Sequence, residues 1–152
     1  MKSEMFKVNV VSLHYKLKHD TTDYPIIKNS KIAADIFYES WDKYTIGLEE
    51  QFKVLYLNRG GKVIGLYTVS IGGVTGTVVC NKKILACGLK IVASGMIIAH
   101  NHPSGNNKPS EQDRIITKSL KECGKIMDIK LLDHIILLPN GNFVSFADIN
   151  EL

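Results

Sequence analysis

Apolar residues recur along the chain in short runs whose spacing predicts alternating strands and helices. A first run at residues 5–13 predicts a strand, and the polar, turn-rich segment 14–25 predicts a loop. Apolar positions at helical spacing then predict a helix over residues 30–43, with Ser30 as its N-cap. The pattern thus places a strand and a loop before the first helix.

The remaining pattern predicts a hairpin followed by helices and strands in alternation. Two apolar runs, 51–57 and 63–70, flank an Asn-Arg-Gly-Gly segment that favours a tight turn between antiparallel strands. Helical spacing predicts helices over 81–92 and 110–123, with Gly124 ending the second one. Short apolar runs predict three more strands, at residues 96–100, 131–138 and 143–146.

Strands and helices that alternate around one mostly buried sheet predict an α/β or α+β fold. The 152 residues contain no long Pro/Gly/Ser linker and no repeat, so a single core suffices. We expect an N-terminal strand and arm over residues 1–29 and one domain over residues 30–152.

Composition narrows the classes of function. Lys and Arg total 19 against 15 Asp and Glu, and the small positive surplus is scattered, which is more typical of a solvated surface than of a nucleic-acid interface. Three cysteines without a CxxC pair (Cys80, Cys87 and Cys123) indicate neither a disulfide framework nor a cysteine-ligated zinc site. No apolar run is long enough for a membrane helix or a signal peptide, so a cytoplasmic location without a membrane partner is the expectation.

Candidate chemistry is concentrated between residues 97 and 113. His100 and His102 stand two apart at the end of a predicted strand, so both side chains leave the sheet on the same side. The following Pro- and Gly-containing loop reverses the chain and leads to a helix with Asp113 in its first turn. Two imidazoles and a carboxylate are a common ligand set for catalytic zinc, with the fourth position left for water.

The same residues allow an interpretation without a metal. A His-x-His pair alone is weak support for a metal site, and Ser110 with Asp113 forms the S-x-x-D pattern of a helix cap. Sequence alone therefore leaves both a ligand and a cap open for Asp113.

The string H-x-H-x7-S-x2-D resembles the motif of JAMM (MPN) metallohydrolases. The fuller HNHPSG…PS..D, with Leu132-Asp133-His134-Ile135 and Ser145-Phe146, resembles the RadC-like branch from about Ser30 to the C-terminus. This resemblance implies a cytidine-deaminase-like α/β fold with a mixed sheet flanked by helices, a zinc ion on His100, His102 and Asp113, and peptidase or isopeptidase activity. It also implies an upstream glutamate as general acid and base, for which Glu50 is the match and Glu49 the neighbouring alternative.

The mechanism that this resemblance implies gives Glu50 and Ser110 catalytic roles. Glu50 takes a proton from water and returns it to the leaving amine, and the Ser110 hydroxyl donates a hydrogen bond to the developing oxyanion. Asp133 and His134 interrupt an apolar strand and need partners. They either orient a metal ligand or form a core pair satisfied by the backbone, and both interpretations remain open.

The chain departs from the RadC-like pattern in two places. Asn81-Lys82-Lys83 stands where relatives carry a Pro-Arg-Glu-like turn. Longer RadC-like proteins begin with a helix-hairpin-helix region associated with DNA binding, whereas only an arm precedes the metal domain in this sequence. This second departure weakens the DNA-binding role that the family name would imply, and the resemblance makes a peptide or protein the expected substrate.

Two other functions compete with the hydrolase. One is a metal-dependent DNA-processing factor, suggested by the DNA-repair association of RadC-like proteins, and the other is a binding module without turnover. A nucleobase deaminase is excluded because the H-x-E and P-C-x-x-C motifs are missing. The sequence does not identify the substrate or the oligomeric state.

Overall fold

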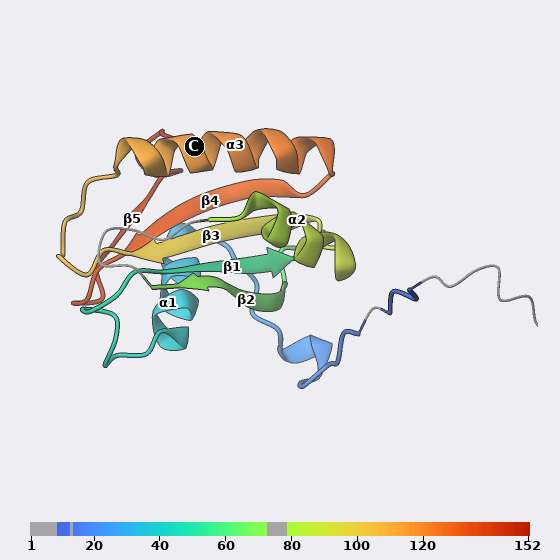
Figure 1. Ribbon diagram of the computed structural model, residues 1–152. Coiled ribbons are helices and arrows are strands. Elements are labelled where there is room, and N and C mark those ends of the chain that lie inside the picture. The colour runs from blue at the N-terminus through green and yellow to red at the C-terminus, as the bar shows by residue number, and fades with distance from the viewer. Residues whose placement is uncertain (1–8, 13, 73–78) are drawn as a thin grey trace, which may run out of the picture.

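The computed structural model describes residues 9–12, 14–72 and 79–152 (Figure 1). The helical elements are a short 3-10 helix, η1 (Thr21–Asp23), and the α-helices α1 (Ser30–Ser40), α2 (Asn81–Lys90) and α3 (Glu111–Ile126). The strands are β1 (Gln51–Leu57), β2 (Val63–Ile71), β3 (Gly95–Asn101), β4 (Lys130–Leu137) and β5 (Phe143–Ser145). None of the helices in these ranges is long and apolar enough to cross a membrane.

The five strands form one mixed sheet in the order β2-β1-β3-β4-β5. β3 and β4 pair in parallel, and the other neighbouring pairs are antiparallel. Parallel neighbours need a crossover connection, which α3 supplies between β3 and β4. The loop that leaves β3 and enters α3 therefore lies at one end of the central strands.

Helices cover both faces of the sheet. α1 packs on one face through Phe37, and Trp41 directly after the helix joins the same cluster with Leu55 of β1 and Ile97 of β3. α2 and α3 cover the opposite face, where another cluster gathers apolar residues of both helices with those of β1 and β3. Figure 1 shows α1 and α3 on opposite sides of the strands. Every residue of β1 and β3 is buried, as expected for strands covered on both faces.

The expected α/β fold, with a mixed sheet flanked by helices, is confirmed, as are the hairpin and the later strands. The strand predicted over residues 5–13 is wrong for residues 9–12, which are exposed and not in a strand, and the rest of it lies outside the described residues. The division into an arm and a domain at residue 30 stays a prediction. In the structure, Ile27 donates its N–H to Gly61 O at 3.0 Å, so the end of the arm contacts the hairpin.

Two predicted features of α1 are wrong. Asn29, rather than Ser30, is the N-cap, because its side chain accepts the Ile32 N–H at 2.9 Å. The Ser30 hydroxyl instead donates to Asp148 at 2.6 Å. The helix ends at Ser40 rather than at residue 43, since Trp41 takes an extended conformation and the Lys53 ammonium donates to the Ser40 carbonyl.

Gly124 does not end α3, which continues to Ile126. A Cβ at this position would lie 2.3 Å from the carbonyl oxygen of Ile129. Glycine is required here because the chain passes closely over the helix as it turns into β4. The glycine at position 124 therefore indicates a close approach of two backbone segments and does not mark the end of the helix.

Candidate metal centre

His100 occupies the end of a buried strand. Alternation along β3 turns its side chain toward the α2 and α3 face, where the ring stacks on Phe52 with centroids 6.2 Å apart. His102 follows directly after the strand, and its N–H donates to Leu137 O of β4 at 2.9 Å. Backbone pairing thus fixes the position of both histidines.

A loop and a helix cap return Asp113 to these histidines. The turn after His102 closes with a Gly105 N–H to His102 O bond of 3.0 Å, and Gly105 has a φ of 78°, which glycine adopts readily. Ser110 then caps α3 by accepting the Asp113 N–H at 3.1 Å, while Asp113 Oδ2 accepts the Ser110 N–H at 2.7 Å. The cap that the S-x-x-D pattern predicts is therefore present, and it sets the position of the Asp113 carboxylate.

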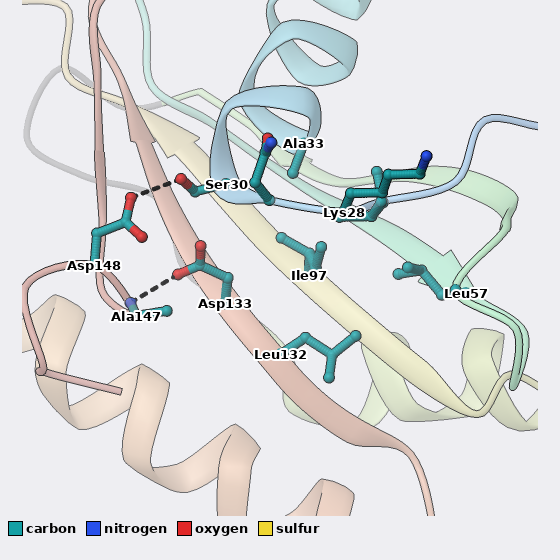
Figure 2. A pocket seen from close by; sticks show the side chains of 12 residues that line it. Lys28, Ser30, Ala33, Leu57, Ile97, Leu132, Asp133, Ala147 and Asp148 are labelled. Atoms are coloured by element: carbon teal, nitrogen blue, oxygen red, sulfur yellow. Dashed lines mark hydrogen bonds between the residues drawn. The ribbon is translucent and has the colours of Figure 1, made fainter.

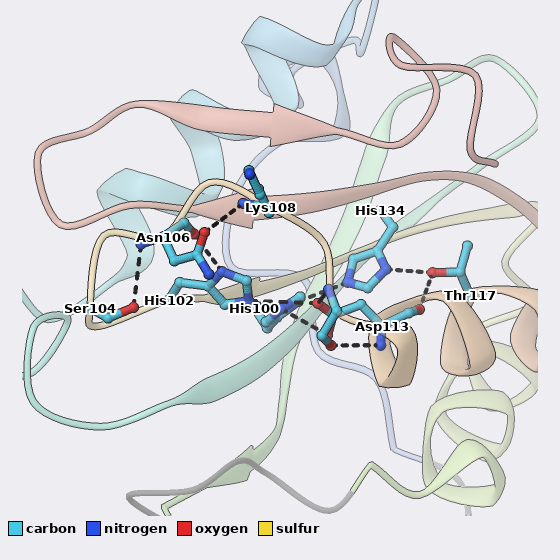
Figure 3. Close-up of polar contacts among 9 residues, drawn as sticks. His100, His102, Ser104, Asn106, Lys108, Asp113, Thr117 and His134 are labelled. Atoms are coloured by element: carbon cyan, nitrogen blue, oxygen red, sulfur yellow. Dashed lines mark hydrogen bonds and ion pairs between the residues drawn. The ribbon is translucent and has the colours of Figure 1, made fainter.

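The three candidate ligands converge on one point, so the cap and the ligand interpretations of Asp113 are compatible (Figure 3). His100 Nε2 lies 3.2 Å from Asp113 Oδ1 and 2.9 Å from His102 Nε2. His102 Nε2 lies 3.6 Å from Asp113 Oδ2. One ligand atom from each residue falls within a group no wider than 4.8 Å.

These separations suit a small divalent cation. Donor atoms on one tetrahedral zinc lie about 3.3 Å apart when its bonds are about 2.0 Å long. His100 Nε2 lies 2.9 Å from His102 Nε2 and 3.2 Å from Asp113 Oδ1, both near this value, whereas the 3.6 Å distance from His102 Nε2 runs to the other carboxylate oxygen, Oδ2. A shared cation would also relieve the close approach of the two ring nitrogens, so His100, His102 and Asp113 could hold a metal ion.

The electrostatics of the cluster favour a negative carboxylate. Burial opposes ionisation of Asp113, but its hydrogen bonds with His100 and His102 lower the pKa of the carboxyl well below its usual range. Burial likewise opposes protonation of His102, yet its bonds to Asp113 and to the Asn106 carbonyl raise its pKa. An ionised carboxylate is the form that binds a cation.

The far nitrogen of His102 is occupied. Its Nδ1 lies 2.6 Å from the carbonyl oxygen of Asn106, four residues along the same loop. A carbonyl only accepts, so Nδ1 carries the proton, and in the neutral ring Nε2 presents its lone pair to the cluster.

His134, whose role the sequence left open, contacts His100 on the side of the ring away from Asp113. His134 Nε2 is 2.8 Å from His100 Nδ1, and His134 Nδ1 is 2.6 Å from the Thr117 hydroxyl (Figure 3). Thr117 was missed, although its place one helical turn after Asp113 is a signal that could have found it. Burial lowers the pKa of His134 well below its ordinary value, and the neighbouring His100 adds to this effect.

Asp133 lies on the other face of the sheet. Its carboxylate accepts hydrogen bonds from the Ser145 hydroxyl at 2.6 Å and from the N–H groups of His134 and Ala147. Figure 2 shows Asp133 in a pocket with Ser30 and Asp148, beside α1. Asp133 is therefore satisfied by one hydroxyl and two backbone N–H groups, away from the histidines.

The predicted glutamate lies near the cluster. Glu50 is half-buried just before β1, and its charge contributes to the raised pKa of His102. The Asn101 side chain holds both neighbours of Glu50, since it accepts the Gln51 N–H at 2.8 Å and donates to Glu49 O at 2.9 Å. Asn101 thus ties the Glu50 segment to the strand that carries His100.

A mixed sheet flanked by helices, with two histidines and an aspartate converging at a strand end, defines a candidate metal-binding α/β domain. Residues 27–151 match the model of the RadC-like JAB domain, and the chain belongs to this family.

Several curated relatives, all called UPF0758 proteins, are similar to the chain. One from Flavobacterium johnsoniae is 44% identical over 65% of the chain and 43% of the relative, and one from Syntrophomonas wolfei is 46% identical over 58% and 37%. A third, from Thermosynechococcus vestitus, is 35% identical over 86% of the chain and 48% of the relative. The chain thus spans about half the length of the curated relatives it matches, or less.

Proposed function

We propose that this domain is a zinc-dependent hydrolase that cleaves a peptide or isopeptide bond. The observation that carries the proposal is the convergence of His100, His102 and Asp113, whose ligand atoms lie within 4.8 Å of one another. A group of this size could hold one small cation, and three protein ligands would leave a position for water, as in catalytic zinc sites. His100, His102 and Asp113 are the proposed ligands.

Zinc is the preferred ion because of the donor set. Two imidazoles and one carboxylate suit zinc better than magnesium or calcium, which take mostly oxygen ligands. A zinc ion at this site would supply a bound water with a pKa near 7 and would polarise a carbonyl oxygen.

Glu50 is the proposed general base and acid. It stands at the start of β1, close enough to influence His102, and Asn101 holds the backbone on either side of it. Glu50 would accept a proton from the attacking water and deliver it to the leaving amine. Glu49, whose side chain accepts a hydrogen bond from Gln51 at 3.4 Å, is the neighbouring alternative.

Ser110 is the proposed oxyanion donor. Its oxygen accepts the Asp113 N–H, which leaves the hydroxyl proton available to another acceptor. A donor of this kind typically contributes about 3 to 4 kcal/mol to transition-state stabilisation. Ser110 would then serve both the α3 cap and the reaction.

The decisive experiment compares the zinc-loaded protein with Glu50→Gln on peptide, isopeptide and branched-DNA substrates. Loss of the proton carrier should lower peptide or isopeptide cleavage by about 100-fold or more, with zinc content unchanged. Glu49→Gln is the matched control, since it alters the adjacent carboxylate and should retain activity.

Other outcomes would contradict the proposal in distinct ways. Strand scission that depends on Glu50 would support the DNA-processing function instead. Substrate binding without turnover in all three proteins would support a binding module. Less than about half an equivalent of zinc after exposure to the ion would refute the metal site itself.

A further inference from the structure

The surroundings of His100 contain a buried chain of hydrogen bonds that ordinary core packing does not require. His134 is fully buried, with its ring stacked on Phe146 at 4.6 Å and tilted against Phe52 at 6.0 Å. Both of its ring nitrogens have a partner on a different element, His100 on β3 and Thr117 on α3. An imidazole used only to fill space would not need this arrangement.

The direction of each hydrogen bond follows from counting protons. The Thr117 hydroxyl has one proton, and Asp113 O, 2.6 Å away, can only accept it. The bond between Thr117 and His134 Nδ1 must then be donated by the histidine. A neutral His134 with its proton on Nδ1 has a lone pair on Nε2, so His100 Nδ1 donates to it.

We propose that Thr117 and His134 form a buried relay that keeps the proton of His100 on Nδ1 and turns its Nε2 lone pair toward the metal position. This inference rests on the proposed zinc site and adds two positioning residues that do not touch the ion. Partners that orient a metal-bound histidine usually strengthen its binding of the metal.

The relay also connects two ligands through one helix. α3 provides Asp113 as a candidate ligand and Thr117 one turn later, and the Thr117 hydroxyl bonds to the backbone of Asp113 itself. A shift of α3 along its axis would therefore move the carboxylate and the end of the relay together. The position of α3 therefore influences the orientation of both the His100 ring and the Asp113 carboxylate.

A matched pair of variants at Thr117 tests the relay. Thr117→Val keeps the shape but removes the acceptor for His134, and zinc affinity measured by chelator competition should fall about 10- to 100-fold. Thr117→Ser keeps the hydroxyl but loses a buried methyl group, and its affinity should stay within about 3-fold of the wild type. A purely structural role of Thr117 would not give this order, since serine leaves the larger cavity.

A second pair at His134 covers the case that a Thr117 variant fails to fold. His134→Gln can still offer a carbonyl oxygen to His100 Nδ1, whereas His134→Leu cannot. The glutamine variant should bind zinc more tightly than the leucine variant.

Proton positions provide a readout independent of activity. Long-range ¹H–¹⁵N spectra of the zinc-loaded protein with labelled histidines should show His100 and His134 both protonated on Nδ1. A proton on His134 Nε2, or zinc affinity of Thr117→Val within about 2-fold of the wild type, would overturn the relay. If the wild type binds no zinc, the proposed function fails, and the proton on His134 in the metal-free protein still decides the relay.

Discussion

His100 and His102 stand two residues apart and present the same ring nitrogen to the same point, yet different parts of the molecule hold them. His100 contacts the buried side chain of His134 on β4, which is 34 residues away along the chain. His134 in turn contacts Thr117 on α3, from which it is separated by 17 residues. Behind His102 lies one backbone carbonyl, four residues further along the same loop.

The difference shows that one metal site can combine long-range and local support. The His100 side chain is 2% exposed, so its hydrogen bonds cannot be replaced by water when a partner is lost. The His102 side chain is 15% exposed and can exchange a lost partner for solvent. We therefore expect changes around His100 to cost more than changes around His102.

The largest effect should come from removing each ring in the metal-free protein. His100→Ala leaves a cavity against Phe52 and an unpaired nitrogen on buried His134, and should lower the free energy of unfolding by about 2 to 4 kcal/mol. His102→Ala should lower it by less than about 1 kcal/mol. Urea unfolding measures both, and equal losses would refute the comparison.

A change of intermediate size in the free energy of unfolding is expected at Ser110, which lies between the loop and α3. Ser110→Ala removes the acceptor for the Asp113 N–H and should lower the free energy of unfolding by about 1 kcal/mol. Ser110→Thr is the control, because threonine also caps helices. An alanine variant as stable as the threonine variant in thermal unfolding would mean that the cap contributes nothing to the stability of the protein.

The smallest effect should come from the loop behind His102. Asn106→Ala removes the turn in which the Asn106 side chain accepts the Lys108 N–H at 3.0 Å, but it keeps the backbone carbonyl that His102 uses. Zinc affinity by chelator competition should fall by less than about 5-fold, below the range typical of partners behind a ligand. The exposed neighbour Asn107→Ala serves as the control. If Asn106→Ala lowered zinc affinity as much as Thr117→Val, the partners of His100 and His102 would be equally important, and the comparison would be refuted.

Much of this site follows from local sequence. Alternation along a strand puts His100 on the chosen face, His102 lies at the strand end, and the S-x-x-D pattern specifies the cap that contains Asp113. Predictions from local patterns were wrong where a contact with a distant segment of the chain determines the role of a residue. Gly124 lies within a helix, where the absence of a side chain leaves room for Ile129, and Asn29 is the cap while Ser30 donates to Asp148.

By itself, the sequence determined the alternating elements, the spacing of the candidate ligands and the kinship with RadC-like JAB domains. Only the tertiary structure decided that His134 and Asp133, adjacent in β4, serve opposite faces of the sheet, and that Thr117 completes the hydrogen bonds behind His100. The physical reason is that helical and strand periods are properties of neighbouring residues. The partner of a buried polar group instead depends on how strands pair and how a helix packs on the sheet, because these contacts bring together residues far apart in the chain.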